Sequence, residues 1–153
     1  MANHIRRQVR EALVTALTGL STTGSRVYVN SDDPLADGVT SALRLRVGPE
    51  AVSQRAFNGE VIEVERAMTF TVTAQASGSS MTTVLNLLDT IAKEVENALL
   101  TMAAKQLGGL ARNLQLVSTD TRTSGEANQY FGDLEMQLEL QASVREGAPD
   151  TLA

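Results

Sequence analysis

Residues 60–76 read EVIEVERAMTFTVTAQA and are the best guide to the fold. The even positions are mostly apolar, with Ile62, Val64, Met68, Phe70, Val72 and Ala74, whereas the odd positions are mostly polar. Alternation with a period of two is typical of a β-strand that buries one face and exposes the other. Strands usually span about 5 or 6 residues, so we expect this long one to extend beyond its own sheet as a hairpin arm.

The sequence on either side repeats this pattern and adds two amphipathic helices. Residues 134–144 alternate in the same way, and further strands are predicted at 26–29, 42–47 and 113–123. Apolar residues at spacings of three and four predict helices over 3–18 and 81–106. Gly48–Pro49 is expected to end the strand 42–47, and residues 124–129 are expected to form a polar loop.

Each predicted strand of the sheet has one apolar and one polar face, which favours an antiparallel sheet because buried parallel strands are apolar on both faces. The predicted fold class is therefore α+β: an antiparallel β-sheet with long hairpin strands, packed on one face by two α-helices. The chain has 153 residues, a suitable length for one hydrophobic core. We predict a single domain over residues 1–145 and a flexible C-terminal tail over residues 146–153, which show no periodicity.

Composition excludes several classes of function. The chain has no cysteine, which removes disulfides, thiolate metal sites and cysteine nucleophiles. Its net charge is −5, so general affinity for DNA through phosphate neutralisation is not expected. Apolar runs fall short of the roughly 18 to 20 residues of a membrane span, and the N-terminus resembles an amphipathic helix more than a signal peptide, which predicts a cytoplasmic protein without membrane contact.

Catalytic or metal-binding chemistry has little support in the sequence. His4 is the only histidine and lies near the N-terminus, which argues against a histidine triad or a multi-histidine metal site. The loop 19–26 has P-loop glycine spacing without the lysine, and residues 33–44 lack the ligands of a calcium loop. Carboxylate pairs on one strand face, Glu63 with Glu65 or Glu135 with Glu139, are more simply solvated acids. We predict no enzyme, no cofactor and no metal.

The arginines offer a possible contact surface. Arg6, Arg7 and Arg10 lie on the first predicted helix, and Arg44 and Arg46 on the polar face of the strand 42–47. Such charges most often form a solvated face, but they could also bind an anionic partner or make salt bridges between subunits. The long strands with unpaired edges favour association with other chains.

The order of these features resembles that of tail terminator proteins of long non-contractile-tailed phages, the minor tail protein U group. The resemblance covers most of residues 3–145 and rests on three kinds of feature. These are the N-terminal helix with IRRQV (5–9), the strands RVYV (26–29), ALRLRV (42–47) and RAMTFTV (66–72), and the long helix ending near GGL (108–110) before a closing hairpin.

This resemblance implies a homo-oligomer, a hexameric ring that lies in the neck region of the virion tail and assembles in the host cytoplasm. Such a ring caps the tail tube, ends its polymerisation, contacts the tail tube protein and the head–tail connector, and lets DNA pass through its lumen without sequence-specific binding. Glu63, Glu65, Glu135 and Glu139 would then be candidates for the lumen. The expected loops 49–59 and 120–132 would contact neighbours, which adds Phe57, Asn58, Tyr130 and Phe131 to the five arginines as candidate interface residues.

Two other functions remain open at this stage. One is a different neck or tail-tube component. The other is a small-ligand or peptide-binding module that uses a groove between the long helix and the sheet, where Arg66 is the one polar residue that interrupts an apolar strand face. An enzyme ranks third, because it would need a cluster of carboxylates.

Overall fold

A computed structural model describes residues 3–33, 35–58, 61–101, 104–145 and 147–152, with side chains in the same ranges except at 55–58, 61 and 151. Two helices, α1 (Ile5–Leu17) and α2 (Met81–Leu99), and a short 3-10 helix η1 (Leu107–Gly109) accompany six strands. The strands are β1 (Val27–Val29), β2 (Ser41–Asn58), β3 (Val61–Gly78), β4 (Arg112–Glu126), β5 (Gln129–Arg145) and β6 (Ala148–Leu152).

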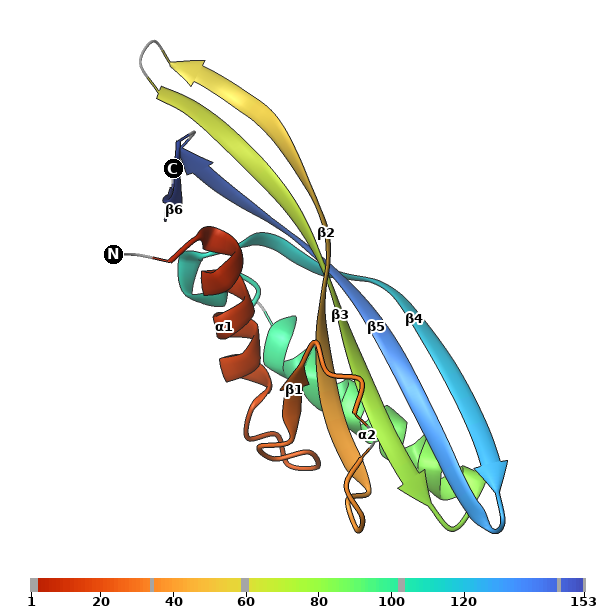
Figure 1. Cartoon of the computed structure of the whole chain (residues 1–153). Coiled ribbons are helices and arrows are strands. Elements are labelled where there is room, and N and C mark those ends of the chain that lie inside the picture. The colour runs from red at the N-terminus through yellow and green to blue at the C-terminus, as the bar shows by residue number, and fades with distance from the viewer. Residues whose placement is uncertain (1–2, 34, 59–60, 102–103, 146, 153) are drawn as a thin grey trace.

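All six strands belong to one sheet in the order β1-β2-β3-β5-β4, with β6 added to β5. Every pair is antiparallel except β1–β2, which is parallel. Figure 1 shows both helices on the same side of the curved sheet, and the end of the β2–β3 hairpin projecting past them. The predicted α+β class is therefore confirmed, as is the long strand predicted at 60–76.

The core lies between the helices and the even-numbered faces of β3 and β5. The stripe of α2 is almost fully buried, and it consists of Val84, Leu88, Ile91, Val95 and Leu99. It packs on a strand layer that includes Phe70, Val72, Met136 and Leu138. Ser80 caps the start of α2, because its side chain accepts a hydrogen bond from the Thr83 amide at 3.2 Å. The helix ends at Leu99 rather than Gln106, because Leu100 leaves the helical conformation (φ −109°, ψ 4°).

Gly132 sets the distance between α2 and the sheet. A Cβ atom at this position would lie 2.7 Å from Val84 Cγ1 and 2.8 Å from Leu88 Cδ1. Real Cβ atoms do not approach other atoms so closely, so only a residue without a side chain allows the helix to pack at this depth. The close contact depends on two segments far apart in the sequence.

The prediction that Gly48–Pro49 ends a strand is wrong. β2 continues through both residues as a β-bulge, since the register passes from Val47↔Phe70 to Glu50↔Met68 and leaves Thr69 opposite two residues. Proline is tolerated at a bulge of an outer strand because no ladder hydrogen bond is lost there. Residues 49–58, expected as a loop, are therefore part of the hairpin arm, and the bulge exchanges which residues of β2 face the helices.

The prediction of a polar loop at 124–129 is also wrong. The turn consists only of Ala127 (φ 47°) and Asn128 (φ 66°), and β4 and β5 run up to it on either side. Two residues with positive φ match the twist of a hairpin. Without the usual Asn-Gly pair, the sequence gives no clear signal for so tight a turn. Residues 120–132, expected as a contact loop, thus lie mainly in strands.

Residues 148–152, expected to belong to a flexible tail, form β6. Gly147 (φ 77°) reverses the chain, and Ala148 then pairs with Arg145 and Leu152 with Val144. The Gln8 side chain of α1 donates a hydrogen bond to the Asp150 carbonyl at 3.2 Å. A pairing partner in β5 and an anchor on α1 account for the ordered strand.

Candidate assembly surfaces

The polar face of the sheet is the side that neither described helix covers. The helices pack on the even residues of β3 and β5, so the odd residues of both strands point the other way. On these two central strands the uncovered face carries the acids Glu63, Glu65, Asp133, Glu135 and Glu139 and the base Arg145. Threonine and glutamine side chains lie between them, which makes this face polar and acidic.

The four acids predicted for a lumen all lie on this face, but they are spread along it. Glu63 is opposite Arg145, Glu135 is opposite Thr73, and Glu139 is opposite Thr69. Glu135 and Glu139 are four positions apart on β5, which corresponds to about 13 Å at 3.3 Å per residue. The arrangement provides a line of negative charge rather than a pair of carboxylates held for acid–base chemistry.

Arg44 was predicted as an interface residue, and the structure contradicts this because the side chain is only 7% exposed. Its guanidinium donates hydrogen bonds to Gln75 Oε1 (2.6 Å), to the Ser31 carbonyl (2.6 Å) and to the Asp33 carbonyl. It also stacks over the Tyr28 ring, 5.7 Å from the ring centroid. Arg44 therefore fastens the 30–33 loop to the sheet within one subunit.

The other predicted arginines do not join Arg44 in one patch. Arg46 is exposed beside it and forms an ion pair with Asp32. Arg6, Arg7 and Arg10 are on α1, which lies on the opposite side of the sheet, and Arg7 pairs with Glu11 at 2.6 Å. The basic residues are thus divided between two faces, and their ion pairs lie within the subunit.

A charged cluster beneath the start of α1 was missed by the sequence analysis. Glu50 Oε1 lies 2.5 Å from Arg66 Nη1, Glu50 Oε2 lies 3.3 Å from Arg6 Nε, and the Glu50 side chain is 12% exposed. The interruption of an apolar strand face by Arg66 was the available signal, but only the bulge of β2 places Glu50 against it. The Glu50–Arg66 pair joins the two strands of the hairpin arm, and the Glu50–Arg6 pair connects the arm to α1.

His4 belongs to the same region and caps α1. Its Nδ1 accepts a hydrogen bond from the Arg6 amide at 3.1 Å, which requires an unprotonated nitrogen. Partial burial lowers the pKa of His4 below its ordinary value, the nearby Arg6 and Arg66 guanidiniums lower the pKa further, and Glu50 and Asp150 act in the opposite direction. The neutral form of His4 is therefore favoured in the folded chain.

The hairpin tips hold the remaining predicted contact residues. Tyr130 is half-buried and packs over Gly125, where a Cβ atom would lie 2.8 Å from the ring. Phe131 points to the polar face, is 42% exposed, and lines an open depression of about 450 Å³ together with the 35–39 loop. Phe57 and Asn58 end β2, and their side chains lie outside the described residues.

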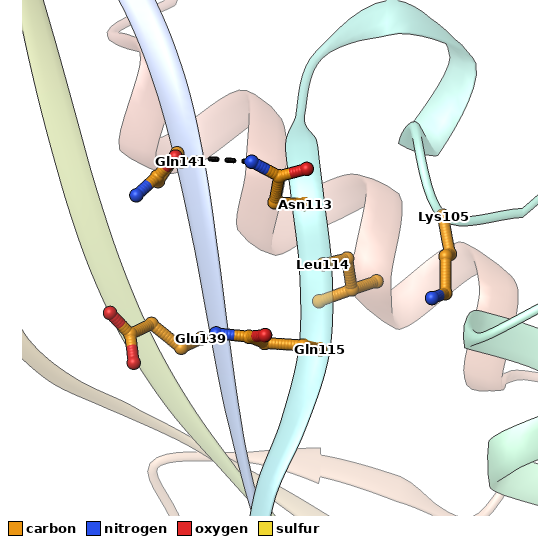
Figure 2. A pocket seen from close by; sticks show the side chains of 6 residues that line it. All are labelled: Lys105, Asn113, Leu114, Gln115, Glu139 and Gln141. Carbon is orange, nitrogen blue, oxygen red and sulfur yellow. Dashed lines mark hydrogen bonds between the residues drawn. The ribbon is translucent and has the colours of Figure 1, made fainter.

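The depressions in the described surface are open to solvent. One depression, of about 220 Å³, lies along β4. Figure 2 shows the side chains that line it, with the Glu139 carboxylate and the Lys105 ammonium on opposite sides of β4. The space between α2 and the sheet, where a ligand groove was considered, is filled by core side chains. Among the described residues, no three His, Asp or Glu side chains come together in a way that could hold a metal ion.

No protein-family model matches the chain, and no curated protein matches it. One similar solved structure is a chain of the "Virion of native gene transfer agent (GTA) particle", with 15% identity, a TM-score of 0.41, and coverage of 90% of this chain and 92% of that chain. So low a TM-score carries no argument about function. Within the described residues, no helix has the length and apolar character needed to cross a bilayer.

Proposed function

We propose that this chain is a structural subunit of a phage tail that forms a closed ring, most simply a hexamer, and acts as a tail terminator. The ring would cap the tail tube, stop its polymerisation and join it to the head–tail connector. The supporting observation is the uncovered polar face of the sheet, with five acids and one base on its two central strands. This role is structural and requires no catalytic residue.

A lumen for DNA needs such a face. Duplex DNA carries dense negative charge, so a wall of acidic and neutral polar side chains repels phosphates and lets the duplex pass without sticking. If the polar face points inward, the helices form the outer layer of the ring. The hairpins at the two ends of the sheet then project along the ring axis, where tube and connector would dock.

Termination follows from the symmetry of such a particle. A head-to-tail interface that closes leaves no free subunit surface within the ring, whereas one that fails to close produces a filament. One end of the ring must match the tube, and the other must not match a further tube subunit. The strands that lead to the two hairpin ends differ in sequence, which supports such an asymmetry.

The first experiment measures particle mass and shape. Light scattering at several concentrations and salt levels should give about six times the 16.3 kDa subunit mass, and electron microscopy should show rings with a central hole. Added to polymerising tail tube protein, the rings should shorten the tubes. Rings that leave tube length unchanged would contradict a terminator, and a monomer at every concentration would contradict the ring itself.

A second experiment tests which face lines the hole. Reversing two acids of the polar face, Glu135→Lys with Glu139→Lys, should make the ring retain short linear duplex DNA at low salt. The matched control reverses two exposed acids of α2, Asp89→Lys with Glu96→Lys, and so changes the net charge equally. Stronger retention by the first variant supports an inward polar face, and equal retention contradicts it.

A further inference from the structure

The outer edge of β4 is a long backbone edge that no described strand covers. β4 is the terminal strand of the sheet, and from Ser118 to Glu126 its register with β5 is unbroken. Natural proteins usually protect such edges with charged side chains, especially lysine, or with proline or bulges. This run contains neither lysine nor proline, and both bulges of β4 lie before it. Its charged residues Asp120 and Arg122 pair with each other at 3.3 Å on the polar face, and Glu126 lies beside the turn, so the backbone edge is left open for pairing.

The turn geometry identifies which β4 groups point outward. In a hairpin with a two-residue turn, the residues flanking the turn form a hydrogen-bonded pair, and such pairs alternate with non-bonded pairs along the strands. Glu126↔Gln129 flanks the turn, so Thr119, Thr121 and Thr123 occupy non-bonded positions. Their amides and carbonyls face away from β5, toward a potential partner.

The sheet has a second open edge at the other end of its strand order, along β2. β1 covers β2 only as far as Leu45, and the Val47 amide donates to Asn30 Oδ1 at 3.2 Å. Beyond the bulge, Glu50–Gln54 pair with β3 in unbroken register, and no described strand covers their outer side. On this segment Val52 is 57% exposed and faces the same side of the sheet as Thr121, since both pair with even residues of a central strand.

Strand directions make the two edges complementary. β2 runs antiparallel to β3, β3 to β5, and β5 to β4, so β2 and β4 run in opposite directions. In a ring, neighbouring copies keep the same orientation, so β4 of one copy would meet β2 of the next as an antiparallel pair. The uncovered segment of β2 lies in the hairpin arm, whereas the uncovered segment of β4 lies next to the β4–β5 turn at the opposite end of the sheet. The two segments are therefore staggered along the strand direction, and closed sheets require a stagger of this kind.

We propose that the outer edge of β4 (Ser118–Glu126) pairs with the outer edge of the β2 arm (Glu50–Gln54) in a second copy of this chain, so that one sheet continues around the ring. The inference rests on the proposed function for its ring symmetry. A second copy fits better than a separate peptide because the chain itself carries a matching edge of correct direction. Pairing β4 with β4 would stop at a dimer and leave the β2 edge open.

Edge blocking provides the first test. Thr121→Pro removes an amide that points outward and therefore leaves the β4–β5 ladder intact, whereas the matched control Thr121→Val keeps both the amide and a β-branched side chain. The proline variant is expected to sediment mainly as a monomer with an unchanged circular dichroism spectrum, and the valine variant as a ring. Rings of unchanged mass in the proline variant would overturn the edge pairing while leaving the proposed function in place.

Disulfide trapping gives an independent test that does not rely on the proline variant folding. The chain has no cysteine, so introduced cysteines can only pair with one another. Val52→Cys is combined in turn with Thr119→Cys, Thr121→Cys or Thr123→Cys, which covers neighbouring registers on the same side of the sheet. Because these threonines point their amides and carbonyls toward the partner, a residue opposite one of them forms a hydrogen-bonded pair with it, and the Cα atoms of such pairs lie about 5.5 Å apart, within disulfide range.

The outcomes separate the alternatives. One double variant should give a non-reducing ladder that ends at a closed hexamer, while each single variant stays uncrosslinked. A dimer from Thr121→Cys alone would show β4–β4 pairing and overturn the inference. Hexamers in solution without any ladder would overturn it and spare the proposed function, whereas a chain that remains monomeric and uncrosslinked at all concentrations would overturn both.

Discussion

Arg44 and Arg46 lie two residues apart on the same strand, but their removal should have very different effects on stability. Arg44 is buried and donates to Gln75 Oε1 and to the carbonyls of Ser31 and Asp33. Arg46 pairs with Asp32 on the surface, where the two side chains are 56% and 79% exposed. The pair therefore forms a matched test of the assignment of Arg44 as an internal clamp.

The magnitudes follow from these contacts. A hydrogen bond to a charged group is worth about 1.5–3 kcal/mol, but carbonyls on a partly exposed loop regain water when the partner is removed. We therefore expect Arg44→Ala to lower the free energy of unfolding by about 2–3 kcal/mol, and the melting temperature by about 4–12 °C for a chain of this size. Arg46→Ala should cost less than about 1 kcal/mol, as is usual for exposed ion pairs.

The assay is urea and thermal unfolding of both variants at the same protein concentration, because assembly would make stability depend on concentration. The dependence of the unfolding free energy on urea should not change, since neither substitution alters the surface exposed on unfolding. Equal losses in the two variants, or an Arg44→Ala variant as stable as the parent chain, would refute the clamp.

Two further predictions concern the packing at Gly132 and the cap of α1. Gly132→Ala should destabilise the fold by about 1–3 kcal/mol through overpacking against Val84. The double variant Gly132→Ala with Val84→Ala should lose at least about 0.5 kcal/mol less stability than the sum of the two single variants. The measurement is urea unfolding, and additive losses would contradict the contact. Because the folded-state pKa of His4 is lowered, the unfolded chain takes up a proton more readily, and stability should fall as the pH drops below the ordinary value of 6.5. His4→Asn keeps a capping side chain without the titration, so its urea midpoint should fall less than that of the parent between about pH 7.5 and about pH 5.5, and equal falls would contradict the assignment.

Alternation along the strands was sufficient to predict the layers and the polar face. Residues 134–144 alternate throughout, and residues 60–76 alternate except at 60–61 and 66–67. Such a pattern fits a strand with one buried face and hardly any other structure. For this reason Glu63 with Glu65, and Glu135 with Glu139, were assigned to polar strand faces from sequence alone, and the register of β3 with β5 shows that these faces lie on one side of the sheet. Their role in a lumen stays a prediction.

Local sequence signals gave wrong predictions of secondary structure where tertiary contacts determine it. Gly48–Pro49 has the composition of a turn, but pairing with β3 on one side carries the strand through as a bulge. Residues 148–152 show no periodicity, and their order comes from β5 and from Gln8. Neither partner is close in sequence, so neither outcome could be read from the local residues.

The sequence by itself determined the fold class and the two faces of the sheet, because burial of alternate residues is a local property of a strand. Only the tertiary structure decided which polar residues are available to a partner. Arg44 and Arg46 have the same residue type and lie on the same strand face, so the sequence does not distinguish them. The 30–33 loop folds over the sheet, buries Arg44 and leaves Arg46 exposed. The open edges of β2 and β4 likewise depend on strand order, which pairing across the whole chain sets.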